Sequence, residues 1–282
     1  MIKISSLVFL LLVLNKVFAQ DQQSTNIITY TPSVLLKKDQ IEIKSFNNVY
    51  TQMSHDVDGK TIALGERQTF YTGIFQFTYG ISEDTRVNIG FDVFLNSVKY
   101  KPIGKGNSEP FGRTAIGSFG PRIKVSPFAG LPTFSVQSSL LFPAANNLES
   151  PRFLAHDRLT WWNQFFFDKT INRFQFFAEA DLLFRFRKDA TFLRTPLSLL
   201  ISFFPSQKFS LYGLIQHSPR FDRTIDGGRN RISRTGWFSQ AGVGVKYQLM
   251  PLLNVELLVT DFFSAKNDGL GKTYNIGFRF IN

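Results

Sequence analysis

A strict alternation of apolar and polar side chains over long stretches is the feature that most constrains how this chain can fold. Between residues 174 and 187, one set of alternate positions is wholly apolar, and the other set includes five polar or charged residues. Successive side chains of a β-strand point to opposite faces, whereas a helix would scatter these charges among the phenylalanines. The alternation therefore predicts a strand with one apolar and one polar face.

The same alternation recurs in 87–100, in 237–249 and in the last strand near 272–281. These segments are roughly 11–15 residues long, whereas strands of globular proteins are usually about 5–6 residues long. A strand that crosses a bilayer at a tilt needs about 9–11 residues within the apolar layer. The length of the segments therefore favours strands that span a membrane.

Twelve candidate strands follow one another along the chain, at 41–53, 67–81, 86–100, 112–126, 133–145, 158–168, 174–187, 193–204, 209–218, 236–249, 254–265 and 272–281. Most connections alternate between short turns and longer loops, the longer ones including 54–66, 101–111, 146–157 and 219–235. Even strand counts, short periplasmic turns and longer extracellular loops are typical of bacterial outer-membrane barrels. We therefore predict an all-β chain that forms a single antiparallel transmembrane β-barrel of about 12 strands over residues 41–282.

The first twenty residues have the pattern of a secretory signal peptide. Lys3 precedes an apolar run at 7–14, and Val17-Phe18-Ala19 supplies the small residues that a signal peptidase accepts. We expect cleavage after Ala19, which removes Lys3 and Lys16 and lowers the net charge from +11 to +9. Residues 20–40 are then a polar N-terminal lead-in to the barrel.

Composition narrows the fold class further. Phenylalanine accounts for 32 of the 282 residues, yet no run of about 20 apolar residues is present, so a bundle of transmembrane helices is excluded. The absence of cysteine excludes disulfides and cysteine-based metal or redox sites. We expect no cofactor and no metal.

Aromatic residues near both ends of the outward faces fit the two girdles that flank the lipid-facing band of a barrel. The predicted girdle consists of Tyr71, Trp161, Trp237 and Tyr274 towards the outside and Tyr79, Phe167, Tyr247 and Phe280 towards the inside. A soluble β-sandwich is the alternative, but its strands would be shorter and their outer faces polar.

The inward faces hold the candidate residues of a solute path. They are Asp92, Arg122, Lys124, Glu179, Asp181, Arg185, Arg187, Arg194, Lys246, Glu256 and Arg279. One interpretation is a narrow water-filled path with basic mouths. The other is a filled lumen in which these charges pair with one another, because unpaired buried charges are costly. Phe94, Phe177, Leu183 and Phe204 also point inward, and the sequence leaves both interpretations open.

Catalysis has weak support in the sequence. The three histidines are His55 and His156, each in a predicted loop beside an aspartate, and His217, whose neighbour Ser218 points to the opposite face of a strand. A nucleophile, a base and an orienting group need to converge in space, and no hydrolase, zinc-protease or phosphate-loop motif is present. We therefore predict that the protein is not an enzyme.

Five arginines lie in the predicted loop 219–235. An outer surface that faces phosphate-rich lipopolysaccharide explains basic loops more simply than nucleic acid does, because arginine pairs with phosphate in a bidentate manner. Outer-membrane lipid and lipopolysaccharide are therefore expected partners, and nucleic acid is not.

Several segments together resemble outer-membrane β-barrel proteins of Gram-negative bacteria that are grouped with the transporter barrels named for a phenol-degradation pathway. The segments are Leu35–Lys38 with 41–52, Tyr79-Gly80-Ile81 with 86–92, Arg194-Thr195-Pro196, 240–249, 256–258 and 275–279. The resemblance implies an outer-membrane location, passive transport and assembly by the barrel-assembly machinery. It carries no substrate, and the usual C-terminal aromatic, here Phe280, is followed by two further residues.

These observations predict an outer-membrane channel or transporter for small solutes, with anionic or zwitterionic ones favoured. A non-conducting barrel that serves as a surface binding or structural protein is the first alternative. A lipid-modifying enzyme of the outer membrane is the second.

Overall fold

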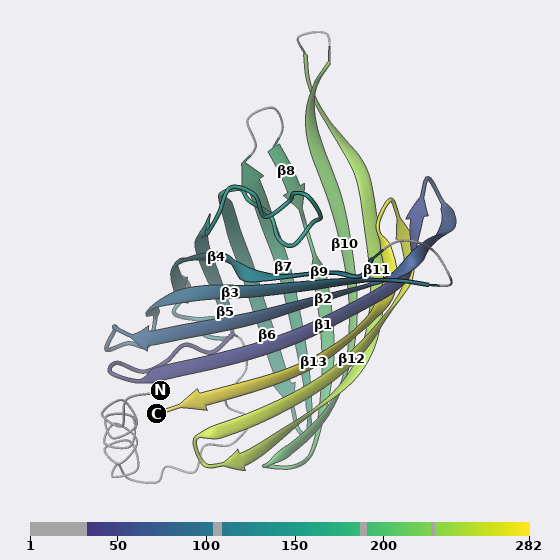
Figure 1. Cartoon of the computed structure of the whole chain (residues 1–282). Coiled ribbons are helices and arrows are strands. Elements are labelled where there is room, and N and C mark those ends of the chain that lie inside the picture. Colours follow the sequence, from purple (N-terminus) through teal and green to yellow (C-terminus); the bar gives the residue numbers. More distant parts are fainter. Residues whose placement is uncertain (1–32, 104–108, 187–190, 227–228) are drawn as a thin grey trace, which may run out of the picture.

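The structure is a computed structural model that describes residues 33–103, 109–186, 191–226 and 229–282. These residues form one closed antiparallel β-sheet (Figure 1). The strands are β1 (Ile41–Val57), β2 (Lys60–Gly80), β3 (Val87–Pro102), β4 (Phe111–Val125), β5 (Phe134–Pro143), β6 (Thr160–Ile171), β7 (Phe174–Phe186), β8 (Thr191–Arg194), β9 (Leu197–Ser206), β10 (Phe209–Asp226), β11 (Arg229–Met250), β12 (Leu253–Lys266) and β13 (Gly269–Ile281). In the described part of the chain, no helix is long and apolar enough to cross a membrane. The predicted signal peptide, residues 1–19, lies outside the described residues.

Apart from β8 and β9, each strand pairs with its neighbours in sequence, and β13 pairs with β1 to close the barrel. The short strand β8 and the strand β9 occupy one position, since β7 and β10 each pair with both of them. They are separated at Thr195-Pro196, where proline has no backbone N–H to give to the sheet. The thirteen segments therefore make a closed barrel of 12 strand positions, which confirms the predicted fold class.

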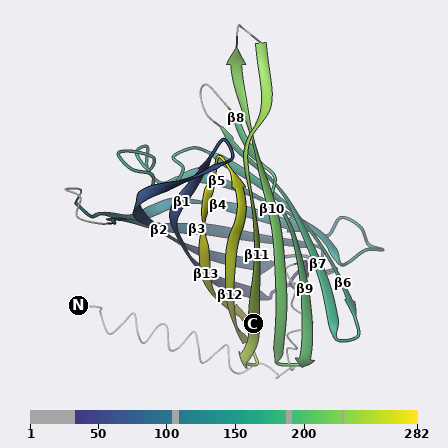
Figure 2. The same ribbon diagram turned by 90° about the vertical axis from the view of Figure 1, so that its right-hand side faces the viewer.

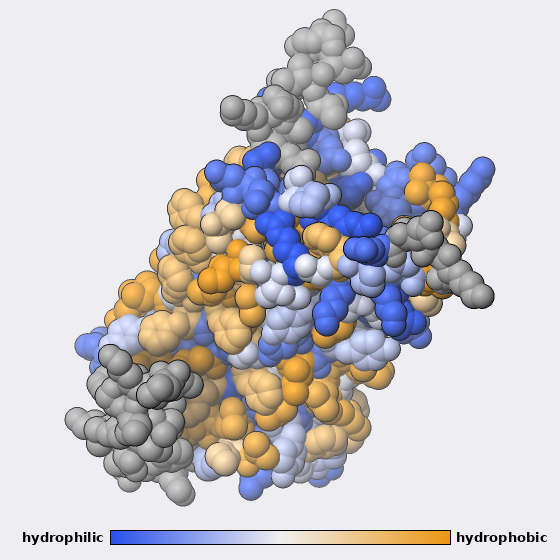
Figure 3. Space-filling model, viewed as in Figure 1, coloured by the Kyte–Doolittle hydropathy of each residue, from blue (hydrophilic) through white to orange (hydrophobic). Residues whose placement is uncertain are grey.

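The two faces of the sheet follow the alternation in the sequence. On β7, Phe174 and Phe176 are 47% and 45% exposed on the outer face, while Gln175 and Asp181 are buried on the inner face. On the face that Figure 3 shows, apolar side chains cover much of the surface, and polar ones gather towards one end. Exposed large apolar side chains occur on all of the strands except the short β8 in the described part of the chain. A continuous apolar band around a closed barrel is the surface that a bilayer covers.

The two ends of the barrel differ. The end at which β1 begins and β13 finishes, called here the lower end, has connections of two to eight residues (Figure 1). At the opposite, upper end lies the 16-residue loop 144–159, and the β10–β11 hairpin rises beyond the rest of the barrel (Figure 2). Short turns on the side of the termini agree with the periplasmic end of an outer-membrane barrel.

Two predicted loops are wrong. Residues 54–66 and 219–235 are largely the paired arms of the β1–β2 and β10–β11 hairpins. The first hairpin turns at Asp58 and Gly59, which have φ values of 51° and 85°, as a two-residue hairpin turn requires. The sequence pattern predicted loops here because these arms extend into water, where neither face of a strand needs apolar residues. His55 therefore lies in β1 rather than in a loop.

Candidate solute path in the barrel lumen

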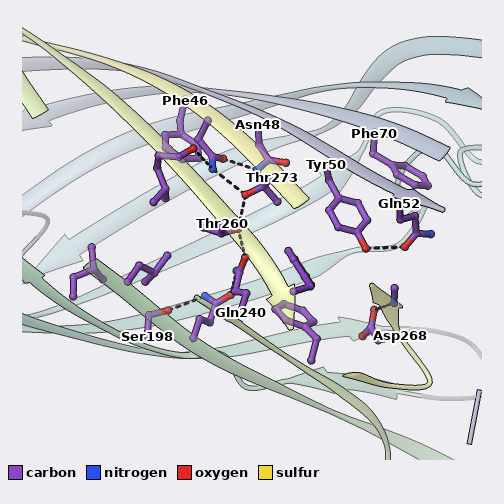
Figure 4. Close-up of a pocket in the computed structure, with 18 of the residues that line it drawn as sticks. Phe46, Asn48, Tyr50, Gln52, Phe70, Ser198, Gln240, Thr260, Asp268 and Thr273 are labelled. Atoms are coloured by element: carbon purple, nitrogen blue, oxygen red, sulfur yellow. Dashed lines mark hydrogen bonds between the residues drawn. The ribbon is translucent and has the colours of Figure 1, made fainter. Parts of the chain in front are cut away.

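A cavity of about 720 Å³ lies within the barrel, off centre. Its lining comes from the inner faces of β1, β2, β7 and β9–β13, together with Phe153 of the 144–159 loop (Figure 4). We call the side formed by β9–β13 and β1 the open half of the lumen, and the side formed by β2–β6 the filled half.

A hydrogen-bonded chain of uncharged polar side chains crosses the open half. We call it the polar belt, and its members are Ser198, Gln216, Gln240, Thr260, Thr273, Asn275 and Asn48. The Gln216 amide donates to Ser198 at 2.7 Å, and the Gln240 amide donates to Gln216 at 2.6 Å. The belt continues through Thr260 onto β13 and β1, and Figure 4 shows several members facing the same space. Because neighbours fix one another's orientation, the belt presents an ordered row of donors and acceptors to the cavity.

Aromatic rings lie above the polar belt, towards the upper end. Phe262 lies 4.7 Å from Phe238 and 5.0 Å from Tyr50, measured between ring centroids. Phe70 lies 6.1 Å from Tyr50 and 6.4 Å from Phe153. The cavity is therefore amphipathic, with an apolar rim at the top and a polar wall below it.

Charged groups lie below the belt. Lys246 Nζ is 3.6 Å from a carboxylate oxygen of Glu256, which also accepts a hydrogen bond from the Tyr212 hydroxyl. Nearer the lower end, Glu42 pairs with Lys44 at 2.9 Å and with Arg279. Lys44, Lys246 and Arg279 are positive and Glu42 and Glu256 are negative. These five groups therefore carry a net charge of +1 below the belt.

The cavity continues towards this charged region. A smaller hollow of about 110 Å³ is lined by Lys44 and Arg279. It shares Phe46, Lys246 and Glu256 with the larger cavity. The open half thus has free space both at the level of the polar belt and closer to the lower end.

The filled half holds a buried ion pair instead of a cavity. Asp92 and Arg122 lie 3.4 Å apart, and their side chains are 1% and 2% exposed. Gln76 and Ser139 each donate to Asp92 at 3.2 Å, and Arg122 donates to Thr78 at 2.6 Å. A buried pair is tolerated when its remaining lone pairs and protons are satisfied in this way.

Residues 33–38 occupy the lower end of the filled half. The backbone N–H of Leu36 donates to Asn88 Oδ1 at 3.1 Å, and the Asn88 amide donates back to the Leu36 carbonyl at 3.3 Å. Lys124 Nζ donates to the carbonyl of Val34 at 3.0 Å. Leu35 and Leu36 are buried, so this part of the lead-in is packed against the inner wall of β3 and β4.

The 144–159 loop occupies the upper end of the filled half. Leu148 and Leu154 are buried against Val98 and Tyr100 of β3. Arg113 donates to the carbonyls of Asn147 and Ser150, each at 2.8 Å. Arg152 pairs with Glu66 at 3.0 Å, and its guanidinium lies 4.6 Å from the Tyr100 ring centroid. The loop is therefore folded into the upper mouth of the barrel.

The predicted lumen residues divide between the two halves. Lys246, Glu256 and Arg279 lie beside the free space of the open half, whereas Asp92, Arg122 and Lys124 are buried in the filled half. Their role in carrying a solute stays a prediction.

The other predicted residues lie on or near β7. Glu179 accepts a hydrogen bond from Gln164 at 2.7 Å and also lines the cavity. Asp181 accepts one from Trp162 at 3.1 Å. Towards the upper end, Arg194 pairs with Asp268 at 2.6 Å, and the Arg185 guanidinium lies 4.9 Å from the ring centroid of Phe192. Arg187 lies outside the described residues.

The predicted girdle residues occupy the outer face. Trp161, Phe167, Tyr247 and Tyr274 are exposed, and Tyr71, Tyr79, Trp237 and Phe280 are half-buried. Three of them have polar partners, as interfacial aromatics commonly do. Tyr71 donates to Asn47, Tyr79 donates to Asp39, and the Trp161 indole donates to Ser138.

The histidines do not assemble a catalytic constellation among the described residues. His217 Nδ1 lies 2.9 Å from the Ser239 hydroxyl, but both residues are on the outer face. His156 pairs with Glu149 within the 144–159 loop at 2.9 Å. In the described part of the chain, no three histidine, aspartate or glutamate residues cluster as metal ligands would.

Sequence reasoning missed Glu42, Lys44 and the polar belt. Glu42 and Lys44 lie in the predicted strand 41–53, where alternation places both on one face with Phe46 and Asn48. The same parity places Gln216 and Gln240 inward. Period-two assignment of every uncharged polar residue, and not only of charged ones, would have found the belt.

The fold and lumen together define a class, that of transmembrane β-barrels of the outer-membrane type. An outer-membrane channel from Pseudomonas putida F1 has a similar structure, with a TM-score of 0.70 and 11% identity over 90% of this chain and 99% of the channel. The β-domain of the Bordetella autotransporter BrkA matches with a TM-score of 0.57 and 12% identity over 86% of this chain and 99% of its own. The translocator domain of the autotransporter NalP from Neisseria meningitidis matches with a TM-score of 0.50 and 11% identity over 87% of this chain and 89% of its own.

At these identities the likeness concerns the fold alone. No family model matches the sequence, and no curated protein matches it.

Proposed function

We propose that this protein is a passive channel for small solutes in the outer membrane of a Gram-negative bacterium, and that solutes pass through the open half of the lumen. The observation that carries the proposal is the cavity of about 720 Å³, which shares three lining residues with the hollow nearer the lower end. Free space lined by fixed polar groups is what a water-filled path requires. The shared fold with the channel from Pseudomonas putida F1 adds support.

The preferred solutes are small polar molecules that carry a negative charge or both charges. Below the polar belt, Lys44, Lys246 and Arg279 exceed Glu42 and Glu256 by one positive charge, which supports this preference because charges that line a narrow path select for the opposite sign. At the level of the belt, Glu179 adds a negative charge to the wall of the cavity, which suits zwitterions. The polar belt offers both donors and acceptors in place of lost hydration, which suits zwitterions and neutral polar groups as well.

A non-conducting barrel is the second candidate, and one observation favours it. Residues 33–38 and the 144–159 loop already occupy opposite ends of the filled half. If similar packing closes the open half, the protein serves as a surface binding or structural barrel.

Planar-bilayer recording separates these candidates. We expect the purified full-length protein to give small, steady single-channel currents with a preference for anions. Replacing Gln240, in the wall of the open half, with tryptophan should reduce the conductance by at least about half, because the added ring occupies the path. Well-folded protein that inserts but carries no current would overturn the channel and favour the non-conducting barrel.

A further inference from the structure

The outer wall formed by β10, β11 and β12 changes character with height. Near mid-height it presents Gly213, Val243 and Val259, which are paired across the three strands. Two outward-facing paired rows follow above it, first Ile215, Ala241 and Asp261 and then His217, Ser239 and Ser264. The next row consists of Pro219, Trp237 and Lys266. Above that row, Arg234 is paired with Phe221. An apolar surface thus passes through polar residues, among them Asp261 paired with Lys272 at 3.5 Å, and an aromatic level into a basic one.

Two cations at the top of this wall are exposed, Arg234 and Lys266. Neither has a carboxylate within ion-pair distance among the residues that the structure describes. Lys266 is paired with Trp237 and shares its outer face. Arg234 also lies on this face, because Thr235 is an extra residue of β11 at a bulge, so that Gly236 pairs with Arg220 and Arg234 pairs with the outward-facing Phe221. Arg223, also exposed, lies on the same face one pleat higher.

The apolar part of the wall is hollowed. A groove of about 520 Å³ is lined on the outer face by residues such as Leu211, Gly213, Val243, Leu257 and Val259. A Cβ atom built on Gly213 would meet no other atom within 4 Å. The groove is therefore open at Gly213, and glycine leaves there the space that a side chain would fill.

The spacing between the groove and the cations matches one membrane leaflet. Val243 lies six residues below Trp237 on β11, which is about 20 Å along a strand and about 15 Å in depth at the usual tilt of a barrel strand. One leaflet contributes about 15 Å of hydrocarbon, half of the total thickness of about 30 Å. An acyl chain whose headgroup sits beside Lys266 would therefore reach the groove.

We propose that this wall is a binding site for one molecule of phosphorylated glycolipid of the outer leaflet, of the lipid A type. Arg234 and Lys266 bind its phosphate groups, Trp237 packs at the level of the sugars, and an acyl chain lies in the groove at Gly213. Charge complementarity supports this occupant, since arginine and lysine form short charge-assisted hydrogen bonds with phosphate. Lys266 at the aromatic level and Arg234 above it, with the apolar groove below, fit a ligand that has both phosphate groups and acyl chains.

The test uses the full-length protein in detergent and purified bisphosphorylated lipid A as the probe, with bound lipid counted by native mass spectrometry. We expect one tightly bound lipid A. The double change Arg234→Ala with Lys266→Ala should weaken its binding at least about tenfold. Gly213→Leu, which fills the groove, should weaken the binding of lipid A severalfold. Lipid A without phosphates should bind to the wild type as weakly as bisphosphorylated lipid A binds to the double variant.

The matched control is Lys99→Ala with Lys101→Ala. Those two lysines are exposed on the outer face of β3, so this change removes the same charge away from the groove and should leave binding intact. Heat-dependent mobility in gel electrophoresis checks that every variant is folded. Unchanged binding in the Arg234 and Lys266 double variant overturns the site. An equal loss in the control, or equally tight binding of phosphatidylglycerol, shows only a general attraction of anionic lipid and overturns it as well. Channel conductance is measured in parallel, so failure of this site is distinguishable from failure of the channel.

Discussion

The two halves of the lumen contain the same kind of ion pair in different surroundings. In the filled half, the side chains of Asp92 and Arg122 are 1% and 2% exposed, whereas Lys246 and Glu256 in the open half are 25% and 28% exposed. Both pairs come from the same inward alternation of neighbouring strands. In the described part of the chain, residues 33–38 and the 144–159 loop pack at the two ends of the wall that holds Asp92 and Arg122.

This difference teaches that a barrel wall does not decide by itself whether its lumen is open. A buried pair loses its hydration and depends on added hydrogen bonds, as Asp92 does on Gln76 and Ser139. A hydrated pair keeps water as a partner and remains available to a passing solute. The filled half therefore stabilises the barrel, and the open half is where we place the solute path.

The largest expected contrast is in stability. Asp92→Asn leaves Arg122 buried beside a neutral group and should lower the free energy of unfolding by about 3–5 kcal/mol. The matched change Glu256→Gln in the open half should cost about 1 kcal/mol or less, because that pair is hydrated. Denaturant unfolding in micelles, followed by tryptophan fluorescence, measures both. Equal costs would contradict the distinction between the halves.

The packing of the 144–159 loop provides the next contrast. Leu148→Ala removes a fully buried side chain and should cost about 2–5 kcal/mol. Leu214→Ala, on the half-buried wall of the cavity, should cost about 1 kcal/mol because less apolar area is lost. The same unfolding measurement applies to both. A larger cost for Leu214 would mean that the open half is packed as tightly as the filled one.

The contact of the lead-in with the wall should contribute less to the free energy of unfolding. Asn88→Ala removes both hydrogen bonds to Leu36 and should cost about 1–3 kcal/mol, the usual penalty for leaving buried polar groups unpaired. Faster proteolysis of residues 33–40 should accompany the loss, with the barrel itself intact. Asn96→Ala serves as the control, since Asn96 lies higher on the same face and, among the described residues, donates to Thr72 and not to the lead-in. Unchanged protection of the lead-in would show that other contacts hold it.

The smallest expected effect is on selectivity. Lys246→Gln removes one of three cations near the path and should reduce the preference for anions by about twofold, an amount typical of partly screened charges. Lys124→Gln, in the filled half, should leave selectivity within error. Reversal potentials in a salt gradient give both values. A larger effect at Lys124 would place the path on the wrong side of the barrel.

Much of the wall was predictable from the sequence, because side-chain period two gives strand number and facing together. The inward placement of Asp92, Lys246 and Arg279 needed nothing more. The contact of Asp92 with Arg122 was not predictable, since it depends on the register between β3 and β4. The arms of the β10–β11 hairpin were missed because Pro219 and the charges on both faces have the composition of a loop.

What fills the lumen could not be predicted from periodicity. Leu35 and Leu36 are two apolar residues in a polar lead-in, and Leu148 and Leu154 are isolated in a loop. No repeating pattern indicates which wall such short segments contact. The position of the cavity depends on those contacts, so the sequence could not predict which side of the lumen holds the candidate path.

The central claim, that solutes pass through the open half, can be tested by chemical modification because the chain has no cysteine of its own. Two single variants are compared in planar bilayers, Leu214→Cys in the open half and Ser139→Cys in the filled half. A negatively charged methanethiosulfonate reagent should reduce the current of the Leu214→Cys protein by at least about half and leave that of the Ser139→Cys protein unchanged. Block at position 139 without block at position 214 would contradict the account.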